Sequence, residues 1–339
     1  MSKQMPKVNG LPQFIGPFKE LLPDYIYYKR AQGYVFRDPT IYKLREMDMF
    51  FLENGVKKVE FTRQMYEAWT NVRPGEKESN VEHRRSAARG FACYLVSLGY
   101  ENIYTGYDDT RIFKRDFIPY VFSKEEIRRM FCVISEWCVQ EPGLRNDSFR
   151  TAMLLYYCCG FRKSEVLGLK MADVDLDTGR VTILNGKNNV SRIVVASDSL
   201  LSELRDYHRK YRTEAAPEDY FLTGEKTGHY PEGSLYGKFR TLLSEAGIAL
   251  RADGGRQRIH DIRHTFCVHT LEKMQEKGFD LYTSLPLLSV YLGHKHITET
   301  EYYLRMMEEH FGGILEKSAA YSPNLFPKYD GEDGGTGAE

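Results

Sequence analysis

Apolar residues recur three and four positions apart in four segments of the first hundred residues, at 18–33, 38–55, 62–72 and 80–100. This spacing, with Gly, Pro and Asp between the segments, is typical of amphipathic helices. It predicts a small helical unit over 19–100, preceded by a flexible N-terminus over 1–18. Residues 101–118 are polar and have no helical stripe, so we predict a linker there.

A second helical pattern begins after Pro119, where Ser123 is placed to cap a helix that has Glu125 and Glu126 in its first turn. The pattern is interrupted over 173–197 by three short β-rich runs, joined by the hairpin signals "DTG" and "NGKNN". Helical spacing resumes at 198–212, 234–247, around 260–271, at 284–293 and at 298–310. We therefore predict a mainly α-helical protein with a small antiparallel β-sheet inside an α+β domain over 119–312, followed by a C-terminal extension over 313–339.

Length and composition fit two globular domains, with 339 residues, 42% hydrophobic and 28% charged. Apolar runs of membrane-spanning length and the apolar core of a signal peptide are both missing, which predicts a cytoplasmic protein without a membrane partner. The six cysteines form no CxxC pair, which suits a reducing compartment. Basic and acidic residues balance at 47 each, but the final segment 323–339 carries one Lys and four acids, so the rest of the chain has a mild basic excess of 46 over 43.

The segment "HDIRHT" places His260, Arg263 and His264 on neighbouring helix faces, because residues three and four apart are adjacent on a helix. A metal site would need a third ligand, and the arginine between the histidines opposes the charge of a metal ion. A phosphate group would be attracted by all three side chains. The segment therefore favours a phosphate site over a metal site.

Three further segments of this domain offer groups suited to a phosphodiester. Arg162 follows a Gly turn in "CCGFRKSEVLGL", His294 follows another in "YLGHKH", and Tyr302 and Tyr303 lie together in "TETEYYLRM". An arginine at a helix start, beside free backbone N–H groups, favours an anion. Each residue also has a plain structural explanation: the arginine could form an ion pair, the histidine could cap a helix, and the tyrosines could pack in the core. The complete set, rather than any single member, therefore indicates a catalytic site.

Taken together and in this order, the segments resemble the catalytic domain of the tyrosine recombinases, also called the phage integrase family. That family has an Arg in a G-[LF]-R-x-S-E box, a Lys on a β-hairpin, H-x-L-R-H-[ST], L-G-H, and a Tyr nine residues after the LGH histidine. The corresponding segments here are "GFRKSE", "NGKNN", "HDIRHT" and "LGHKHITETEYY", and nine positions after His294 is Tyr303. The resemblance extends over residues 119–312, and the preceding helical unit is similar in layout to the family's core-binding domain.

The resemblance implies a role for each matching residue. Tyr303 would attack a DNA phosphate, and Arg162 and Arg263 would hold the negative charge that develops on it. His260 would accept the tyrosine proton, and His294 would hydrogen-bond the phosphate. Lys187 would return a proton to the leaving 5′ oxygen. The assignment of Lys187 stays open, because this loop is written "GKNNVSR" rather than GKGNK, which makes Arg192 a rival cation.

Two residues would support this set. His264 would lie behind the catalytic groups, and Glu165 would orient Arg162 or its helix. Basic side chains on the helices of the first unit would contact DNA, although the same pattern alone equally fits solvated helix faces. These predicted DNA contacts are Lys29, Arg30, Arg84, Arg85 and Arg89.

The resemblance further implies a double-stranded DNA recombination site as partner, a monomer that assembles as a homo-tetramer on DNA, and room for accessory DNA-bending or directionality proteins. It implies no cofactor and no metal, because the phosphotyrosine link stores the energy of the broken bond. Residues 304–322 could dock into a neighbouring subunit or fold back on their own domain. Integrase, resolvase, invertase and transposon recombinase all stay open.

Two alternatives compete with this interpretation. A metal-dependent hydrolase would use His260, His264 and one of His294 or His296, although position 261 is Asp where the HExxH motif has Glu. A DNA-binding protein of the same fold that has lost the reaction is the other, although the full set of expected catalytic residues is present.

Overall fold

The computed structural model describes residues 7–8, 10–36, 38–109, 119–184, 191–226, 228–294 and 296–310. The chain divides into two compact units, Met1–Phe117 and Ile118–Glu339. In the described residues, no helix is both long and apolar enough to cross a membrane.

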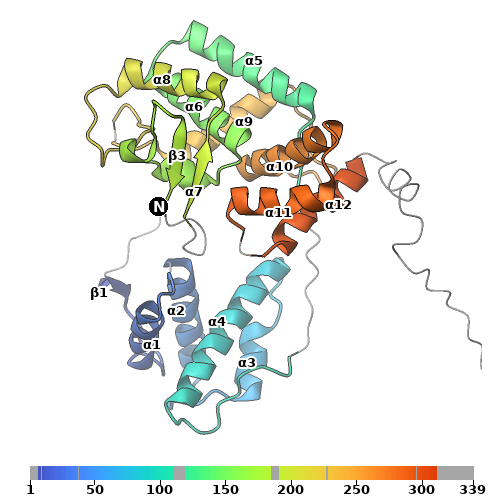
Figure 1. Cartoon of the computed structure of the whole chain (residues 1–339). Coiled ribbons are helices and arrows are strands. Elements are labelled where there is room, and N and C mark those ends of the chain that lie inside the picture. The colour runs from blue at the N-terminus through green and yellow to red at the C-terminus, as the bar shows by residue number, and fades with distance from the viewer. Residues whose placement is uncertain are drawn as a thin grey trace, which may run out of the picture. The chain divides into compact units, whose positions relative to one another are not determined.

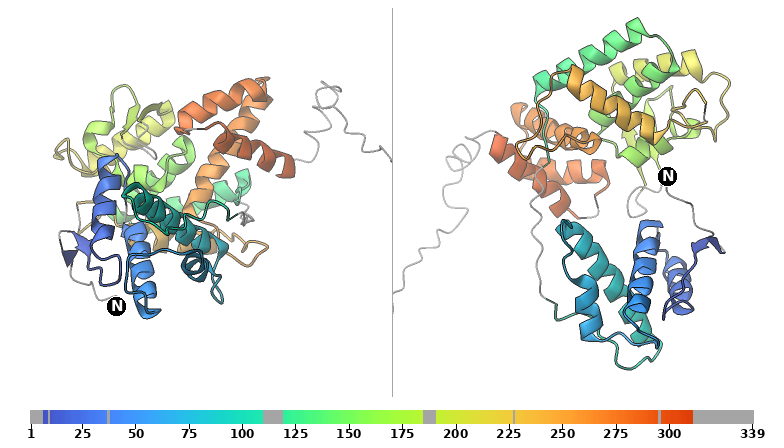
Figure 2. Two further views of the ribbon diagram at one scale, coloured as in Figure 1. Left: turned by 90° about the horizontal axis from the view of Figure 1, so that it is seen from below. Right: turned by 180° about the vertical axis from the view of Figure 1, so that it is seen from behind.

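The first unit is a small helical bundle, drawn in blue to teal in Figure 1 and seen from two other sides in Figure 2. Helix α4 contacts each of the other three helices and contributes Phe91 to an aromatic core with Phe18 and Tyr25. The elements of this unit are β1 (Lys7–Val8), β2 (Leu11–Pro12), α1 (Leu21–Ala31), α2 (Asp38–Glu53), α3 (Arg63–Thr70) and α4 (Glu78–Ser97).

The segment before α1 belongs to this core, so the prediction of a flexible N-terminus is wrong for residues 10–18. The side chains of Leu11, Phe14 and Phe18 are buried. The buried carboxylate of Asp48 accepts hydrogen bonds from the backbone N–H groups of Ile15 (3.1 Å), Gly16 (2.7 Å) and Phe18 (2.9 Å). Apart from the two-residue strand β2, this segment has no helical or strand repeat, so sequence periodicity missed it.

The second unit is mainly helical and carries a small antiparallel sheet, as predicted. Its elements are α5 (Lys124–Gln140), α6 (Leu144–Cys159), α7 (Lys163–Gly168), η1 (Met171–Asp173), β3 (Arg180–Ile183), β4 (Arg192–Val195), α8 (Asp198–Tyr211), α9 (Glu232–Glu245), α10 (Ile259–Glu276), α11 (Leu281–Leu292) and α12 (Thr298–His310). Strands β3 and β4 pair from Arg180 opposite Val195 to Ile183 opposite Arg192. The first of the three predicted β-rich runs is reduced to one antiparallel bridge, from Val174 to Val181.

Helix starts and helix contacts bring the sequence motifs together. Ser123 caps α5, as the sequence indicated, and the structure adds a capping box with Glu126. The buried core of the unit is formed by α5, α6, α8 and α9 with the sheet, and a second cluster joins α10, α11 and α12. Figure 1 shows these last three helices, in orange to red, packed against one another.

Candidate functional site

The turn between α6 and α7 places Arg162. Helix α6 ends at Gly160, whose backbone is left-handed (φ 60°), and a Cβ atom there would lie 2.3 Å from the Phe266 ring of α10. Glycine is therefore required both by the turn and by the close approach of α10. The chain leaves this turn with Arg162 as the N-cap of α7, so the guanidinium starts from a helix N-terminus.

Glu165, one turn into α7, is buried and accepts hydrogen bonds from two arginines. Its Oε2 accepts the backbone N–H of Arg162 (2.8 Å) and its Oε1 accepts Arg162 Nη1 (3.0 Å). Arg192, the first residue of β4, donates from Nη1 to Oε1 (2.9 Å) and from Nη2 to Oε2 (2.8 Å). Arg263 Nη1 lies 3.9 Å from Oε2. Glu165 thus has the predicted contact with Arg162, but its two-pronged partner is Arg192.

These contacts keep Glu165 ionised. Burial favours the neutral acid, but the hydrogen bonds from Arg192 and from the backbone of Arg162, with the charges of both arginines, outweigh it and lower the pKa of Glu165 to about 2. Three guanidinium groups around one carboxylate leave the cluster with a net positive charge. A buried cluster of this sign attracts an anion.

Arg263 is held inside the second unit. Its side chain is 2% exposed. Nη1 donates to the carbonyl of Gly160 (2.6 Å) and Nη2 to the carbonyl of Leu292 (3.0 Å). These bonds tie α10 to the ends of α6 and α11, the two turns that precede Arg162 and His294. The arginine therefore sets the geometry of the site as well as supplying charge.

His294 follows the turn that ends α11 at Gly293, which is left-handed (φ 65°). Its Nε2 lies 3.1 Å from Arg263 Nη2, and its Nδ1 lies 2.8 Å from Thr300 Oγ1. A guanidinium can only donate, so Nε2 accepts and the neutral ring carries its proton on Nδ1, from which it donates to Thr300. Thr300 is fully buried and was not singled out in the sequence, because a threonine in the first turn of a helix has no distinctive pattern.

Tyr303 projects from α12 into the same cluster. Its ring stacks on His294 (centroids 6.3 Å apart, planes at 17°) and lies 5.6 Å from the ring of His264. The side chain is buried with Cys267 and Leu292 in the core of α10, α11 and α12. Burial raises the pKa of Tyr303 well above its usual value, the neighbouring Cys267 thiol adds to this effect, and Arg263 opposes it. The hydroxyl is therefore protonated in this arrangement.

Tyr302, its neighbour, is half-buried, and the two rings meet edge to face at 6.4 Å. The ring contacts with His264 and His294 belong to Tyr303. Tyr303 therefore lies beside His264 and His294, and its role as the nucleophile stays a prediction.

The two histidines of "HDIRHT" lie against each other on α10, with ring centroids 4.7 Å apart. Surrounding protein desolvates the ring of His260, and the charges of Arg263 and Arg258 add to this, which lowers the pKa of His260 to about 4 although the residue keeps an exposed surface. Burial and the adjacent His260 lower the pKa of His264 to about 3. Both rings are neutral at pH 7, and His264 lies between His260 and Tyr303.

Two of the predicted parts fall outside the described residues, and the described side chains do not support the metal-hydrolase alternative. Lys187 lies outside the described residues, as does the C-terminal extension over 313–339. The metal-hydrolase alternative required His260, His264 and a third ligand around one point. Among the described side chains, no group of three His, Cys, Asp or Glu is arranged to hold a metal ion.

Arg84 and Arg85 of α4 are buried against partners of their own unit, which contradicts their prediction as DNA contacts, whereas the half-buried Arg89 stays a predicted contact. Arg84 is fully buried and donates to Glu76 Oε1 (3.1 Å) and to the carbonyl oxygens of Trp69 and Asn71. Arg85 is also buried, with its Nε 2.9 Å from Asp109 Oδ2. Both guanidinium groups are directed at acceptors of their own unit, so a DNA phosphate could reach them only by displacing these bonds.

Arg89 joins this network by donating to the carbonyl groups of Gly106 (3.0 Å) and Asp109 (2.9 Å). Together with the bridge from Phe61 to Ile103, these bonds attach residues 101–109 to the first unit. The predicted linker is therefore wrong for this part, whose polar groups pair with the arginines of α4.

The two predicted DNA contacts on α1 remain accessible. Arg30 is exposed, and Lys29 is half-buried with its Nζ 4.8 Å from the centre of the Tyr34 ring. Their contact with DNA stays a prediction.

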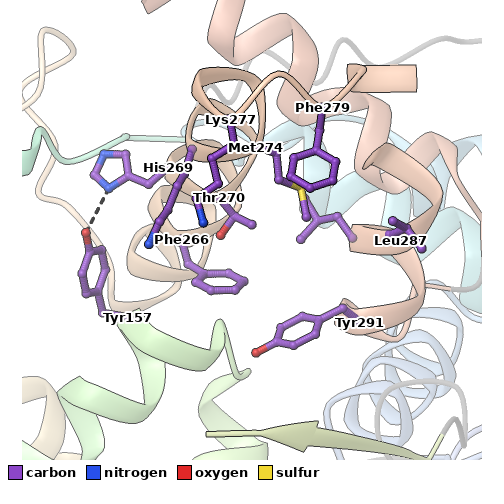
Figure 3. A pocket seen from close by; sticks show the side chains of 11 residues that line it. Tyr157, Phe266, His269, Thr270, Met274, Lys277, Phe279, Leu287 and Tyr291 are labelled. Carbon is purple, nitrogen blue, oxygen red and sulfur yellow. Dashed lines mark hydrogen bonds between the residues drawn. The ribbon is translucent and has the colours of Figure 1, made fainter. Parts of the chain in front are cut away.

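A separate cavity of about 600 Å³ lies between α10 and α11 (Figure 3). Its lining is mainly apolar and includes Phe266, Met274, Leu287 and Tyr291, and the Tyr157 hydroxyl lies 3.1 Å from His269 Nδ1 at its edge. It contains none of the predicted catalytic residues. The candidate site is instead formed where the turns after α6 and α11 meet α10 and α12.

Comparison with known proteins finds related sequences. A family model described as the phage integrase family matches residues 121–310. The protein y4rB of Sinorhizobium fredii, named as an integrase/recombinase, is 28% identical over 297 residues, covering 85% of this chain and 92% of y4rB. The tyrosine recombinase XerA of Thermococcus kodakarensis is 28% identical over 204 residues, covering 59% of this chain and 63% of XerA.

Solved structures share the fold. The XerH site-specific recombinase superposes with a TM-score of 0.61 at 20% identity, covering 82% of this chain and 78% of that one. The Tn1549 transposon integrase superposes with a TM-score of 0.60 at 14% identity, covering 90% and 98%. The family model, which matches more than half of the sequence, and these likenesses in fold lead to one conclusion: the chain belongs to the phage integrase family, the tyrosine recombinases.

Proposed function

We propose that this protein is a site-specific DNA recombinase that cuts and rejoins DNA through a 3′-phosphotyrosine link to Tyr303. The observation that carries the proposal is the meeting of Arg263, His294 and Tyr303, with Arg162 joined to them through Glu165. These groups come from four separate segments of the chain, and each has a part in one phosphoryl transfer.

The two arginines act on the phosphate. Attack by the Tyr303 oxygen on phosphorus builds negative charge on the non-bridging oxygens, which Arg162 and Arg263 are placed to stabilise. His294 donates to the same oxygens only once its Nε2 is protonated. One guanidinium group can bind two such oxygens through parallel N–H bonds. Its positive charge takes the place of the metal ions that other phosphoryl-transfer enzymes use. Removing one such contact typically slows a reaction by about 100-fold.

Two protons must move. Tyr303 loses its proton as its oxygen bonds to phosphorus, and neutral His260 is the proposed acceptor, with His264 between the two rings. The bond from phosphorus to the 5′ oxygen breaks, and Lys187 is the proposed donor of the proton that this oxygen takes up. Reversal of these steps with a new 5′ hydroxyl rejoins the strand, so the reaction consumes no cofactor.

Double-stranded DNA is the proposed substrate, and the first unit is the proposed second half of the DNA-binding surface. Relatives of the same fold support this: XerH is described bound to its difH substrate, and the Tn1549 integrase in complex with transposon right end DNA. Strand exchange between two sites requires several protomers, and we propose a homo-tetramer assembled on DNA.

The test is covalent capture on a supercoiled plasmid that carries the DNA flanking the gene. The wild-type protein is expected to form an adduct that survives detergent and disappears on protease treatment. Tyr303→Phe should bind this DNA and form no adduct, because only the attacking oxygen is removed, whereas Tyr302→Phe should form it. Binding without any adduct by the wild type would indicate a non-catalytic member of the fold, and an active Tyr303→Phe would assign the nucleophile elsewhere.

A further inference from the structure

Arg192 forms the best-aligned ion pair of the candidate site. Its two terminal nitrogens lie 2.9 and 2.8 Å from the two oxygens of Glu165, whereas Arg162 reaches one oxygen at 3.0 Å and Arg263 approaches to 3.9 Å. Parallel two-pronged bonds between guanidinium and carboxylate are among the strongest polar contacts in proteins. The arginine that holds Glu165 is thus outside the expected catalytic set.

The side chain of Arg192 also fills the space between two of the sequence motifs. It is 7% exposed, and its guanidinium carbon lies 5.8 Å from the centre of the Phe161 ring. A Cβ atom on Gly293 would lie 3.2 Å from its Cδ and 3.3 Å from its Nη1. Arg192 therefore touches the turn before Arg162 and the turn before His294 at once.

The bonds of Glu165 affect what the catalytic arginines can offer. A buried ionised carboxylate requires several donors, and Arg192 supplies one to each of its oxygens. Without Arg192, the remaining donors within reach are those of Arg162 and Arg263. Guanidinium N–H groups drawn further toward Glu165 would compete with those needed for a phosphate.

We infer that Arg192 is a positioning residue for DNA strand cleavage. By occupying Glu165, it leaves for the phosphate those N–H groups of Arg162 and Arg263 that are not already bonded within the protein, and it keeps the turns at Phe161 and Gly293 at a set spacing. This inference rests on the proposed function. It also separates Arg192 from the role of general acid, because both terminal nitrogens are bound to Glu165 and a guanidinium is a poor proton donor at neutral pH.

The experiment compares single-turnover formation of the covalent adduct with the plasmid that carries the gene-flanking DNA, at saturating protein. Arg192→Ala is expected to slow adduct formation about tenfold or more, while the Kd for the same DNA changes by no more than about twofold. Arg192→Lys keeps the positive charge but cannot bind both oxygens of Glu165 with two parallel bonds, so its rate should lie between those of wild type and Arg192→Ala. Circular dichroism and thermal unfolding establish that each variant is folded.

Arg150→Ala is the matched control. Arg150 also makes a two-pronged pair with a glutamate of the second unit, Glu203 on α8, outside the candidate site. Its loss should leave the rate of adduct formation within about twofold of wild type.

The double variant Arg192→Ala with Glu165→Gln distinguishes positioning from a merely structural role. If unpaired Glu165 draws the catalytic arginines away, removing its charge should make adduct formation in the double variant at least about threefold faster than in Arg192→Ala. A purely structural role predicts a double variant as slow as, or slower than, the single one.

The outcomes separate the two proposals. Three results would each overturn the role of Arg192 and leave the proposed function intact. They are a wild-type rate of adduct formation in Arg192→Ala, a weaker affinity for DNA with an unchanged rate, and a double variant no faster than Arg192→Ala. A wild-type protein that forms no adduct with this DNA would overturn the proposed function and, with it, this inference.

Discussion

Arg263 and His294 are hydrogen-bonded side chain to side chain, with Nη2 of the arginine 3.1 Å from Nε2 of the histidine. The contact joins "HDIRHT" on α10 to "LGH" at the end of α11, 31 positions apart. Because the arginine can only donate, it also determines which ring nitrogen of His294 carries the proton. Nε2 is the ring nitrogen nearer the arginine, so it must take up a proton before His294 can donate to a phosphate bound there.

Thr300→Val is expected to slow formation of the covalent DNA adduct about tenfold, since a buried donor left without its acceptor costs about 1–3 kcal/mol. Thr300 Oγ1 accepts the Nδ1 proton of His294, and valine has the same shape without the oxygen. Thr300→Ser should retain most of the rate. The measurement is single-turnover adduct formation at saturating protein, and an unchanged rate in Thr300→Val would show that this hydrogen bond does not orient His294.

Arg84→Ala is expected to lower the free energy of unfolding by about 3 kcal/mol, because removing one partner of a buried ion pair leaves the other charge unpaired. The stranded groups would be Glu76 and the carbonyl oxygens of Trp69 and Asn71. Urea denaturation measures the loss, and Arg30→Ala, at an exposed position on α1, should change stability by less than about 0.5 kcal/mol. Stability equal to wild type in Arg84→Ala would contradict the buried network.

Stability of the second unit is expected to fall as the pH drops from about 6.5 to about 4. The pKa values of His260 and His264 lie at about 4 and about 3, below the usual 6.5, so the unfolded chain binds more protons across this range. The stability that the two neutral histidines contribute is complete above pH 6.5 and is lost as the pH falls toward their pKa values in the folded protein. Denaturation midpoints measured across this range should fall less steeply in His264→Gln than in wild type.

His83→Gln, at an exposed position on α4, is the control for this pH dependence and should follow the wild-type curve. Equal slopes for wild type and His264→Gln would mean that His264 is not held neutral by its surroundings.

Lys187→Ala is expected to fail on ordinary DNA and to cleave a substrate whose bridging 5′ oxygen is replaced by sulfur, since a thiolate leaves without taking up a proton. Arg192→Ala should gain no comparable advantage from sulfur, because its defect would lie at the phosphate. The ratio of cleavage rates on the two substrates is the measurement. A large sulfur effect for Arg192→Ala alone would transfer the acid role to Arg192.

Much of the fold was readable from the sequence because the signals are local. Three-and-four spacing of apolar residues located the helices, and the Ser123 capping signal marked the start of α5. The motifs predicted the candidate site through their resemblance to a known family, with Arg162 and His294 each following a glycine turn and Tyr303 nine residues after His294. These features depend only on neighbours within a few positions along the chain.

The distant partners of the charged residues, unlike the predicted contact of Arg162 with Glu165 three positions along the chain, were decided by the tertiary structure. The arginines of α4 and those of α7, β4 and α10 have the same chemistry in sequence, but Arg85 meets Asp109 from 24 positions away and Arg192 meets Glu165 across 27. Which carboxylate opposes an arginine, and whether protein or solvent surrounds the pair, depends on how distant segments pack. Local patterning determines the face on which a charge lies, whereas burial and long-range pairing determine whether that charge stabilises the fold or remains available to DNA.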